Sequence, residues 1–119
     1  MTGTAEDECI FCRIVAGDVP AQVIHQDEEI LAFRDINAQA PTHILLIPRE
    51  HVSSVAELDA SQESLAGRLL LGARSVAESE GLVASGYRLV VNHGAHGGQS
   101  VDHLHLHLLG GRALSWPPG

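Results

Sequence analysis

Residues 102–110 read DHLHLHLLG, in which histidine and leucine alternate. Alternation with a period of two is typical of a β-strand, because every second side chain points to the same face. We therefore expect His103, His105 and His107 on one face and the leucines on the other, against an apolar layer. The segment predicts a strand with an apolar back and a row of histidines at its front.

The surrounding segments predict an antiparallel sheet. Residues 87–93, YRLVVNH, alternate in the same way and connect to the histidine strand through the glycine-rich loop GAHGGQS. Residues 42–48, THILLIP, form a continuous apolar run between prolines, which is typical of a strand at the centre of a sheet. Residues 22–25 and 30–34 are β-prone runs separated by the acidic sequence QDEE, and we expect them to form a hairpin although the turn lacks glycine.

Two helices are expected beside these strands. Apolar residues recur at a spacing of three to four from 61 to 80, with Asp59 or Ser61 as the N-cap and Gly81 after the end. Residues 10–16 have the apolar spacing of a short helix, closed by Gly17. The order of one helix, three strands, one helix and two strands favours an antiparallel α+β fold over a doubly wound one.

Composition narrows the classes of protein. A chain of 119 residues, 45% of them hydrophobic, fits one domain, and we expect a flexible acidic tail at 1–8 before a single domain at 9–119. The net charge of -8 argues against a nucleic-acid partner. All seven basic residues are arginine, which excludes a Walker-type lysine or a lysine Schiff base. No signal peptide, transit peptide or transmembrane run is visible, so we expect a cytoplasmic protein without a membrane partner.

The histidine row suits nucleophilic chemistry better than one shared metal ion. The backbones of His103 and His107 should lie about 13 Å apart, whereas a zinc–nitrogen bond measures about 2.1 Å. A neutral imidazole has a lone pair that can attack phosphorus, and the central His105 is the natural nucleophile. The preceding loop lacks the Walker spacing and leads into a strand, so its amides are expected to bind an anion without a helix dipole, with the Ser100 hydroxyl as a donor. A plain metal site and a solvent-facing strand are the alternatives.

The motif and several longer segments resemble the histidine-triad superfamily. Its signature, HxHxHxx with hydrophobic x, matches residues 103–109. The segments FRDINAQAPTHILLIPREH, YRLVVNHG, GGQSVDHLHLHLLGG and the terminal WPPG resemble its Hint branch, so the similarity spans residues 9–119. The resemblance implies a five-stranded antiparallel sheet with one short and one long helix. It also implies a symmetric homodimer in which two such sheets join into a ten-stranded one.

The resemblance further implies a purine nucleoside phosphoramidase. Such an enzyme cleaves adenosine monophosphate (AMP) from an amine through a nucleotidyl-histidine intermediate, with no cofactor required for catalysis. His105 matches the nucleophile, and His107, His43 and Ser100 complete the catalytic group. In the nucleotide site that the resemblance implies, Asp35 binds the ribose and Ile36 contacts the base. The phosphate and leaving group are surrounded by Asn92, Gly98, Gln99 and Ser100. The site also includes His105, His107 and Trp116, the last from the tail of a second subunit.

Cys9 and Cys12 stand one helical turn apart. From spacing alone, this CxxC motif is compatible with a metal site, a reactive dithiol or two ordinary buried cysteines. The resemblance implies that His51 and His103 complete a structural zinc site with them. Four protein ligands would leave no position for water, so the zinc would be structural, and His103 would leave the catalytic group.

Two other functions are compatible with the same residues. The chain could be a nucleotide- or partner-binding module with weak catalysis, or it could have another histidine-triad activity, such as dinucleoside polyphosphate hydrolysis or nucleotidyl transfer. The WPPG tail and Ser100 favour the phosphoramidase branch. His25, His93 and His96 have no matching role, and we expect them to be solvated surface residues.

Overall fold

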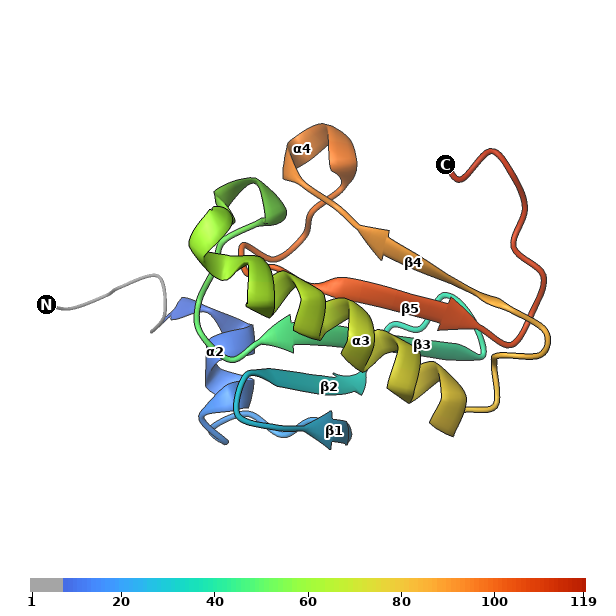
Figure 1. Ribbon diagram of the computed structural model, residues 1–119, viewed down its shortest axis with the longest axis horizontal. Coiled ribbons are helices and arrows are strands. Elements are labelled where there is room, and N and C mark those ends of the chain that lie inside the picture. The colour runs from blue at the N-terminus through green and yellow to red at the C-terminus, as the bar shows by residue number, and fades with distance from the viewer. Residues whose placement is uncertain (1–7) are drawn as a thin grey trace, which may run out of the picture.

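The computed structural model describes residues 8–119, so most of the expected acidic tail lies outside the described residues. The chain forms a five-stranded antiparallel sheet with the strand order β1-β2-β3-β5-β4 (Figure 1). The strands are β1 (Val23–Gln26), β2 (Ile30–Arg34), β3 (Thr42–Pro48), β4 (Tyr87–Val91) and β5 (Leu106–Gly110). The helices are α2 (Ile10–Val15), α3 (Glu63–Ser79) and α4 (Gly94–Gly97), with the 3-10 turns η1 (Val55–Glu57) and η2 (Ala60–Gln62). The antiparallel α+β prediction is confirmed.

The strand predictions hold with small shifts at the ends. The long apolar strand β3 lies at the centre of the sheet, as its sequence predicts, and is buried almost throughout. The hairpin of β1 and β2 closes without glycine because the Asp27 carboxylate accepts the backbone N–H groups of Glu29 and Ile30 at 2.8 and 2.9 Å. Strand β1 starts and ends one residue later than expected, since Gln26 still pairs with Leu31.

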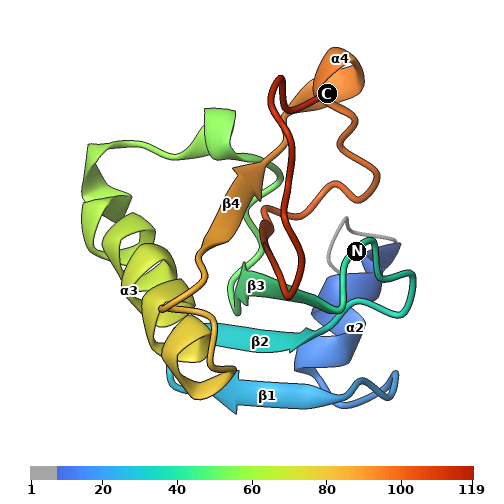
Figure 2. The ribbon, with the colours of Figure 1, turned by 90° about the vertical axis from the view of Figure 1, so that its right-hand side faces the viewer.

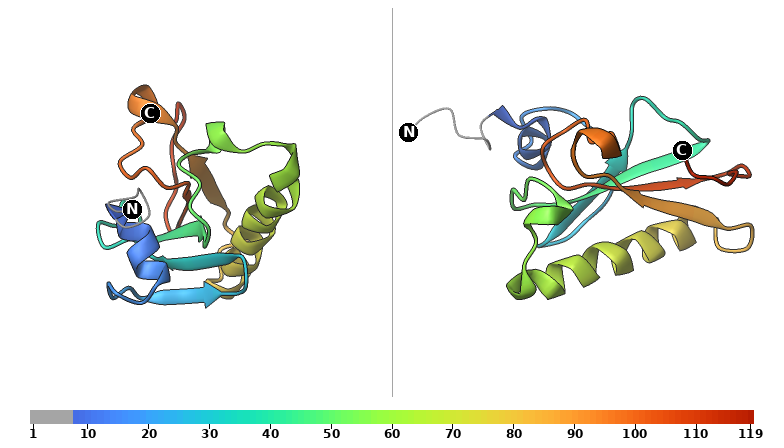
Figure 3. Two further views of the ribbon diagram at one scale, coloured as in Figure 1. Left: turned by 90° about the vertical axis from the view of Figure 1, so that its left-hand side faces the viewer. Right: turned by 90° about the horizontal axis from the view of Figure 1, so that it is seen from above.

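The two faces of the sheet carry different layers. Helix α3 covers one face, and the short helix α2 lies on the opposite face (Figure 2). The view from above in Figure 3 shows α3 running along the sheet. Helix α3 begins two residues later than expected because Asp59 caps the separate turn η2, where Gln62 completes a capping box. The histidine row faces the α2 side, since Leu104, Leu106 and Leu108 pack into the core beneath α3.

The histidine strand is shorter than its sequence pattern. The hydrogen-bonded ladder of β5 begins at Leu106, and residues 103–105 precede it. The backbone N–H of Leu104 donates instead to the carbonyl of Val52 at 2.6 Å, outside the sheet. The glycine-rich loop contains the single helical turn α4 at residues 94–97, for which its sequence contains no signal. Among residues 8–119, no helix combines the length and apolar composition needed to cross a membrane.

Candidate active site

A cavity of about 310 Å³ opens on the α2 side of the sheet. It is lined by five of the residues expected at the nucleotide site: Asp35, Ile36, Ser100, His105 and His107. Arg34 also lines it, and apolar side chains, among them Phe11 and Phe33, form the rest of its wall. An apolar wall with a few convergent polar groups is typical of a small-molecule site. The larger hollow, of about 750 Å³, is more polar and lies beside Cys9 and His51, and neither His105 nor His107 lines it.

Hydrogen bonds fix the tautomers of His43 and His107. The backbone N–H of Gln39 donates to Nδ1 of His43 at 3.0 Å, so the ring proton of neutral His43 is on Nε2. Nε2 of His43 lies 2.9 Å from Nδ1 of His107 and donates to it. The proton of His107 is therefore on Nε2, a buried atom with no hydrogen-bond partner within residues 8–119. An N–H donor at this position is available to a phosphate oxygen.

His105 has the opposite tautomer. Its Nδ1 lies 2.7 Å from the backbone carbonyl of His103, which only accepts, so Nδ1 carries the proton. Nε2 of His105 consequently keeps its lone pair. The ring is 4% exposed, its centroid lies 5.0 Å from that of His107, and the ring of Phe11 meets it edge to face. The result is a buried imidazole whose Nδ1 is occupied by the carbonyl and whose Nε2 is left without that bond, beside the ring N–H donor of His107.

The surroundings keep the other two imidazoles neutral. Burial, followed by the charges of His105 and His43, lowers the pKa of His107 to about 4. Burial also lowers the pKa of His43, opposed by Asp35, whose Oδ2 lies 3.4 Å from Nε2 of His43. Asp35, His43 and His107 lie close enough to hold a metal ion, but His43 and His107 already share a proton between their facing nitrogens. This group is therefore better suited to proton positioning than to metal binding.

Four of the expected nucleotide residues lie outside the cavity lining: Asn92, Gly98, Gln99 and Trp116. The Gln99 side chain closes the loop instead. Its Nε2 donates to the carbonyls of Ser53 and Val101 at 2.8 and 2.9 Å, and its Oε1 accepts the N–H of Gly94 at 3.0 Å. These bonds hold the backbone on both sides of Ser100. Trp116 is 80% exposed in the C-terminal tail.

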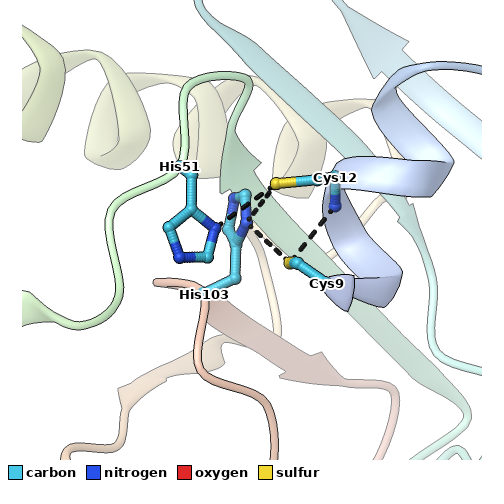
Figure 4. Close-up of side chains that lie close together, drawn as sticks. All are labelled: Cys9, Cys12, His51 and His103. Atoms are coloured by element: carbon cyan, nitrogen blue, oxygen red, sulfur yellow. Dashed lines mark hydrogen bonds between the residues drawn. The ribbon is translucent and has the colours of Figure 1, made fainter. Parts of the chain in front are cut away.

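The four expected metal ligands lie together at the His103 end of the histidine row (Figure 4). They are Cys9, Cys12, His51 and His103. Nδ1 of His103 lies 3.2 Å from Sγ of Cys9 and 3.5 Å from Sγ of Cys12, and Nδ1 of His51 lies 3.3 Å from Sγ of Cys12. No disulfide joins the two cysteines. Tetrahedral zinc with bonds of about 2.1 and 2.3 Å would separate its ligand atoms by about 3.6 Å, close to these distances.

The orientation of His103 also fits a metal ligand. Its Nε2 lies 2.9 Å from the carbonyl of Pro48 and donates to it, so the lone pair of Nδ1 faces both sulfur atoms. The backbone N–H of Cys12 donates to Sγ of Cys9 at 3.3 Å, which holds this sulfur in the cluster. Two thiolates and two imidazoles are the donors that zinc prefers, and the residues present fit such an ion.

Sequence reasoning missed two contributors to the site. Phe11 lies between Cys9 and Cys12 in the sequence, and its ring contacts the rings of both His103 and His105. Its only sequence signal is that an aromatic residue stands within the CxxC motif. Gln39 acts through its backbone N–H, for which no side-chain pattern exists. Both are supplied by segments outside the histidine strand.

The fold and the site together define a small α+β protein of the histidine-triad type. The HIT domain family model matches residues 16–114, and the chain belongs to this family. It is 46% identical over 108 residues to the Escherichia coli K12 protein named purine nucleoside phosphoramidase, with 91% of each chain covered. It is 48% identical over 113 residues to an uncharacterized HIT-like protein of Synechococcus elongatus, covering 95% of this chain and 98% of that one. The crystal structure of a HIT family hydrolase from Legionella pneumophila superposes with a TM-score of 0.92 at 50% identity, covering 93% of this chain and 99% of the other.

Proposed function

We propose that this chain is a nucleotide hydrolase that cleaves the P–N bond of purine nucleoside phosphoramidates. The observation that carries the proposal is the tautomer of His105, whose Nδ1–H is held by the His103 carbonyl so that the lone pair of Nε2 is available. Asp35 and Ser100 line the same cavity as His105, which supports their proposed roles. The similarity to a protein named purine nucleoside phosphoramidase supports the substrate class.

In the proposed reaction, Nε2 of His105 attacks the phosphorus and the P–N bond to the amine breaks. The amine leaves with a proton relayed from solvent through the Ser100 hydroxyl. Water then attacks the nucleotidyl-histidine, releases AMP and a proton, and restores neutral His105. The Nε2–H of His107 stabilises the phosphate oxygens in both steps, with His43 holding its tautomer.

The remaining nucleotide contacts follow from the resemblance and the cavity. Asp35 accepts hydrogen bonds from the ribose hydroxyls, and Ile36 contacts the base. Asn92, Gly98 and Gln99 surround the phosphate and leaving group from the loop side, where Gln99 acts by holding the backbone that flanks Ser100. Trp116 reaches the site of a second subunit.

The test compares AMP release from an AMP–amine phosphoramidate by the parent protein and by a His105→Ala variant. We expect the variant to lose about a thousandfold or more of kcat, because the covalent route is removed. His25→Ala, which removes a histidine from β1, is the matched control and should retain the parent rate. Circular dichroism and AMP binding show that the variants are folded. Equal turnover by parent and variant, or none by the parent, would defeat the proposal.

We also propose that Cys9, Cys12, His51 and His103 hold one structural zinc ion. The set is closed, so the zinc would stabilise the fold and leave no position for a reacting water, and catalysis would need no cofactor. Elemental analysis of untagged protein by mass spectrometry should find about one zinc per chain. Less than one-tenth of an equivalent would contradict the site.

The exposed edge strand β4 supports a homodimer. Val91 and Tyr87 on this strand are partly exposed, and its outer edge has no neighbouring strand within residues 8–119. Pairing of two β4 strands would complete a ten-stranded sheet and cover the β4 edge of each subunit. We further propose that residues 9–119 fold as one domain in the cytoplasm, where thiols stay reduced and able to bind metal, with no nucleic-acid or membrane partner.

A further inference from the structure

Helix α2 connects the metal ligands to the nucleotide cavity. Cys9 caps this helix and Cys12 lies within it, while Ile10, Phe11 and Ile14 of the same segment line the cavity. An isolated helix of six residues is unstable in water. Its position therefore depends on the anchors of its side chains, and the two thiols are its polar anchors to His51 and His103.

His103 forms a second connection. Its ring faces the two sulfur atoms through Nδ1, and its backbone carbonyl accepts the Nδ1–H of His105 at 2.7 Å. The residue is fully buried, so a change in its ring position displaces its backbone unless the core opens. The group that fixes the tautomer of the nucleophile thus belongs to a residue of the ligand cluster.

Phe11 forms a third connection. Its ring packs edge to face on His105, with centroids 5.2 Å apart, and on His103, with centroids 5.8 Å apart. It is 6% exposed, and on its other side it contacts Phe33. Because Phe11 lies between the two cysteines in the chain, a shift of the α2 backbone that moves the thiols also moves the ring that packs on His105.

We propose that occupancy of the Cys9, Cys12, His51 and His103 cluster positions the nucleophile His105 and the α2 wall of the cavity, so that metal binding and nucleotide binding are thermodynamically coupled. His103 and Phe11 are the positioning residues. The inference rests on the proposed function, since it takes His105 as the nucleophile and the cavity as the nucleotide site. Coupling of this kind is reciprocal: AMP must tighten metal binding by the factor by which the metal tightens AMP binding.

The experiment uses the full chain loaded with one equivalent of zinc and the same chain after removal of zinc by a chelator at neutral pH. Long-range nitrogen-15 spectra of the histidine rings should show only the Nδ1–H form of His105 in loaded protein and both forms in stripped protein. Titration calorimetry should give AMP affinity about tenfold weaker without zinc, and zinc affinity about tenfold tighter with saturating AMP. A Phe11→Leu variant, which keeps all four ligands, should bind zinc normally but show a smaller coupling factor, whereas His25→Gln should match the parent.

Three results would overturn the proposal. One is an AMP affinity that changes less than twofold on zinc removal while His105 keeps a single tautomer. Another is loss of all secondary structure on zinc removal, because the effect would then be global and not a local connection through α2. The third is a coupling factor in Phe11→Leu equal to that of the parent. Failure of the loaded protein to bind or turn over nucleotide would instead refute the proposed function, and the tautomer measurement would still decide the coupling.

Discussion

Acidification should destabilise this protein through His107 in particular. The ring is neutral in the folded chain because burial and the neighbouring His105 and His43 lower its pKa from 6.5 to about 4. In the unfolded chain the same ring takes up a proton near pH 6.5. Between these two values the unfolded state binds a proton that the folded state does not. The stability present above pH 6.5 is therefore lost as the pH falls towards 4.

The size of the effect follows from the gap between the two pKa values. Each unit corresponds to about 1.36 kcal/mol, so the full gap of about 2.5 units limits the loss to about 3 kcal/mol. Between pH 7 and pH 4.5 the loss from this one ring should be about 2 kcal/mol. Marginally stable domains have only about 5–15 kcal/mol in total, so the effect is large enough to measure.

Urea unfolding at pH 7 and pH 4.5 tests this value in the parent and in a His107→Gln variant. Glutamine does not titrate and its side-chain oxygen can still accept from Nε2 of His43. Because both proteins share every other titrating group, including the metal ligands, the difference between their losses isolates His107. The parent should lose about 2 kcal/mol more than the variant. Equal losses, or protonation of His107 near pH 6.5 in the folded protein by nuclear magnetic resonance, would refute the reasoning.

Three further predictions concern packing, the loop and assembly. A Gly110→Val variant should lose about 1–3 kcal/mol of stability in urea unfolding, because a Cβ at this position would lie 2.7 Å from the Leu82 side chain. When Gly110→Val is combined with Leu82→Ala, the loss of stability should be smaller than the sum of the losses of the two single variants. Gln99→Ala should lower kcat/KM between about ten- and a hundredfold, because the backbone around Ser100 loses the hydrogen bonds that hold it, while the free energy of unfolding should change little. An unchanged kcat/KM would show that the loop does not need these hydrogen bonds. Val91→Lys should yield a monomer by light scattering after gel filtration, and a mass twice that of the chain would exclude dimerisation through β4.

The sequence predicted the helices and strands that are marked by a pattern within their own residues. The apolar run of β3 is long and unbroken, so both its type and its central place in the sheet could be read directly. The ends of other elements depended on partners distant in the chain. Strand β5 starts at Leu106, which pairs with Val91 at the end of the neighbouring strand β4, although the alternation of side chains begins earlier. The start of α3 depended on a choice between two caps, which the reciprocal bonds of Asp59 and Gln62 decide in favour of a separate turn.

The same distinction applies to the site. Residue types and spacing were enough to identify the histidine row and the CxxC motif, and the structure brings His103 to the cysteines and His105 to the cavity. The tautomers could not be predicted, because they depend on a backbone N–H at Gln39 and a carbonyl at His103 whose directions are set by the folded chain. Phe11 was missed because one apolar residue in a short helix has no pattern of its own.

The reliance of the histidine network on main-chain groups has a consequence for its evolution. Every amino acid except proline carries the amide that the network uses at position 39, and every amino acid carries a carbonyl. The direction of the proton between His43 and His107 thus places no requirement on the side chain at position 39 other than that it is not proline. The path of the backbone at Gln39 decides which ring nitrogens of His43 and His107 carry the protons. A comparison of side chains alone would therefore overlook Gln39.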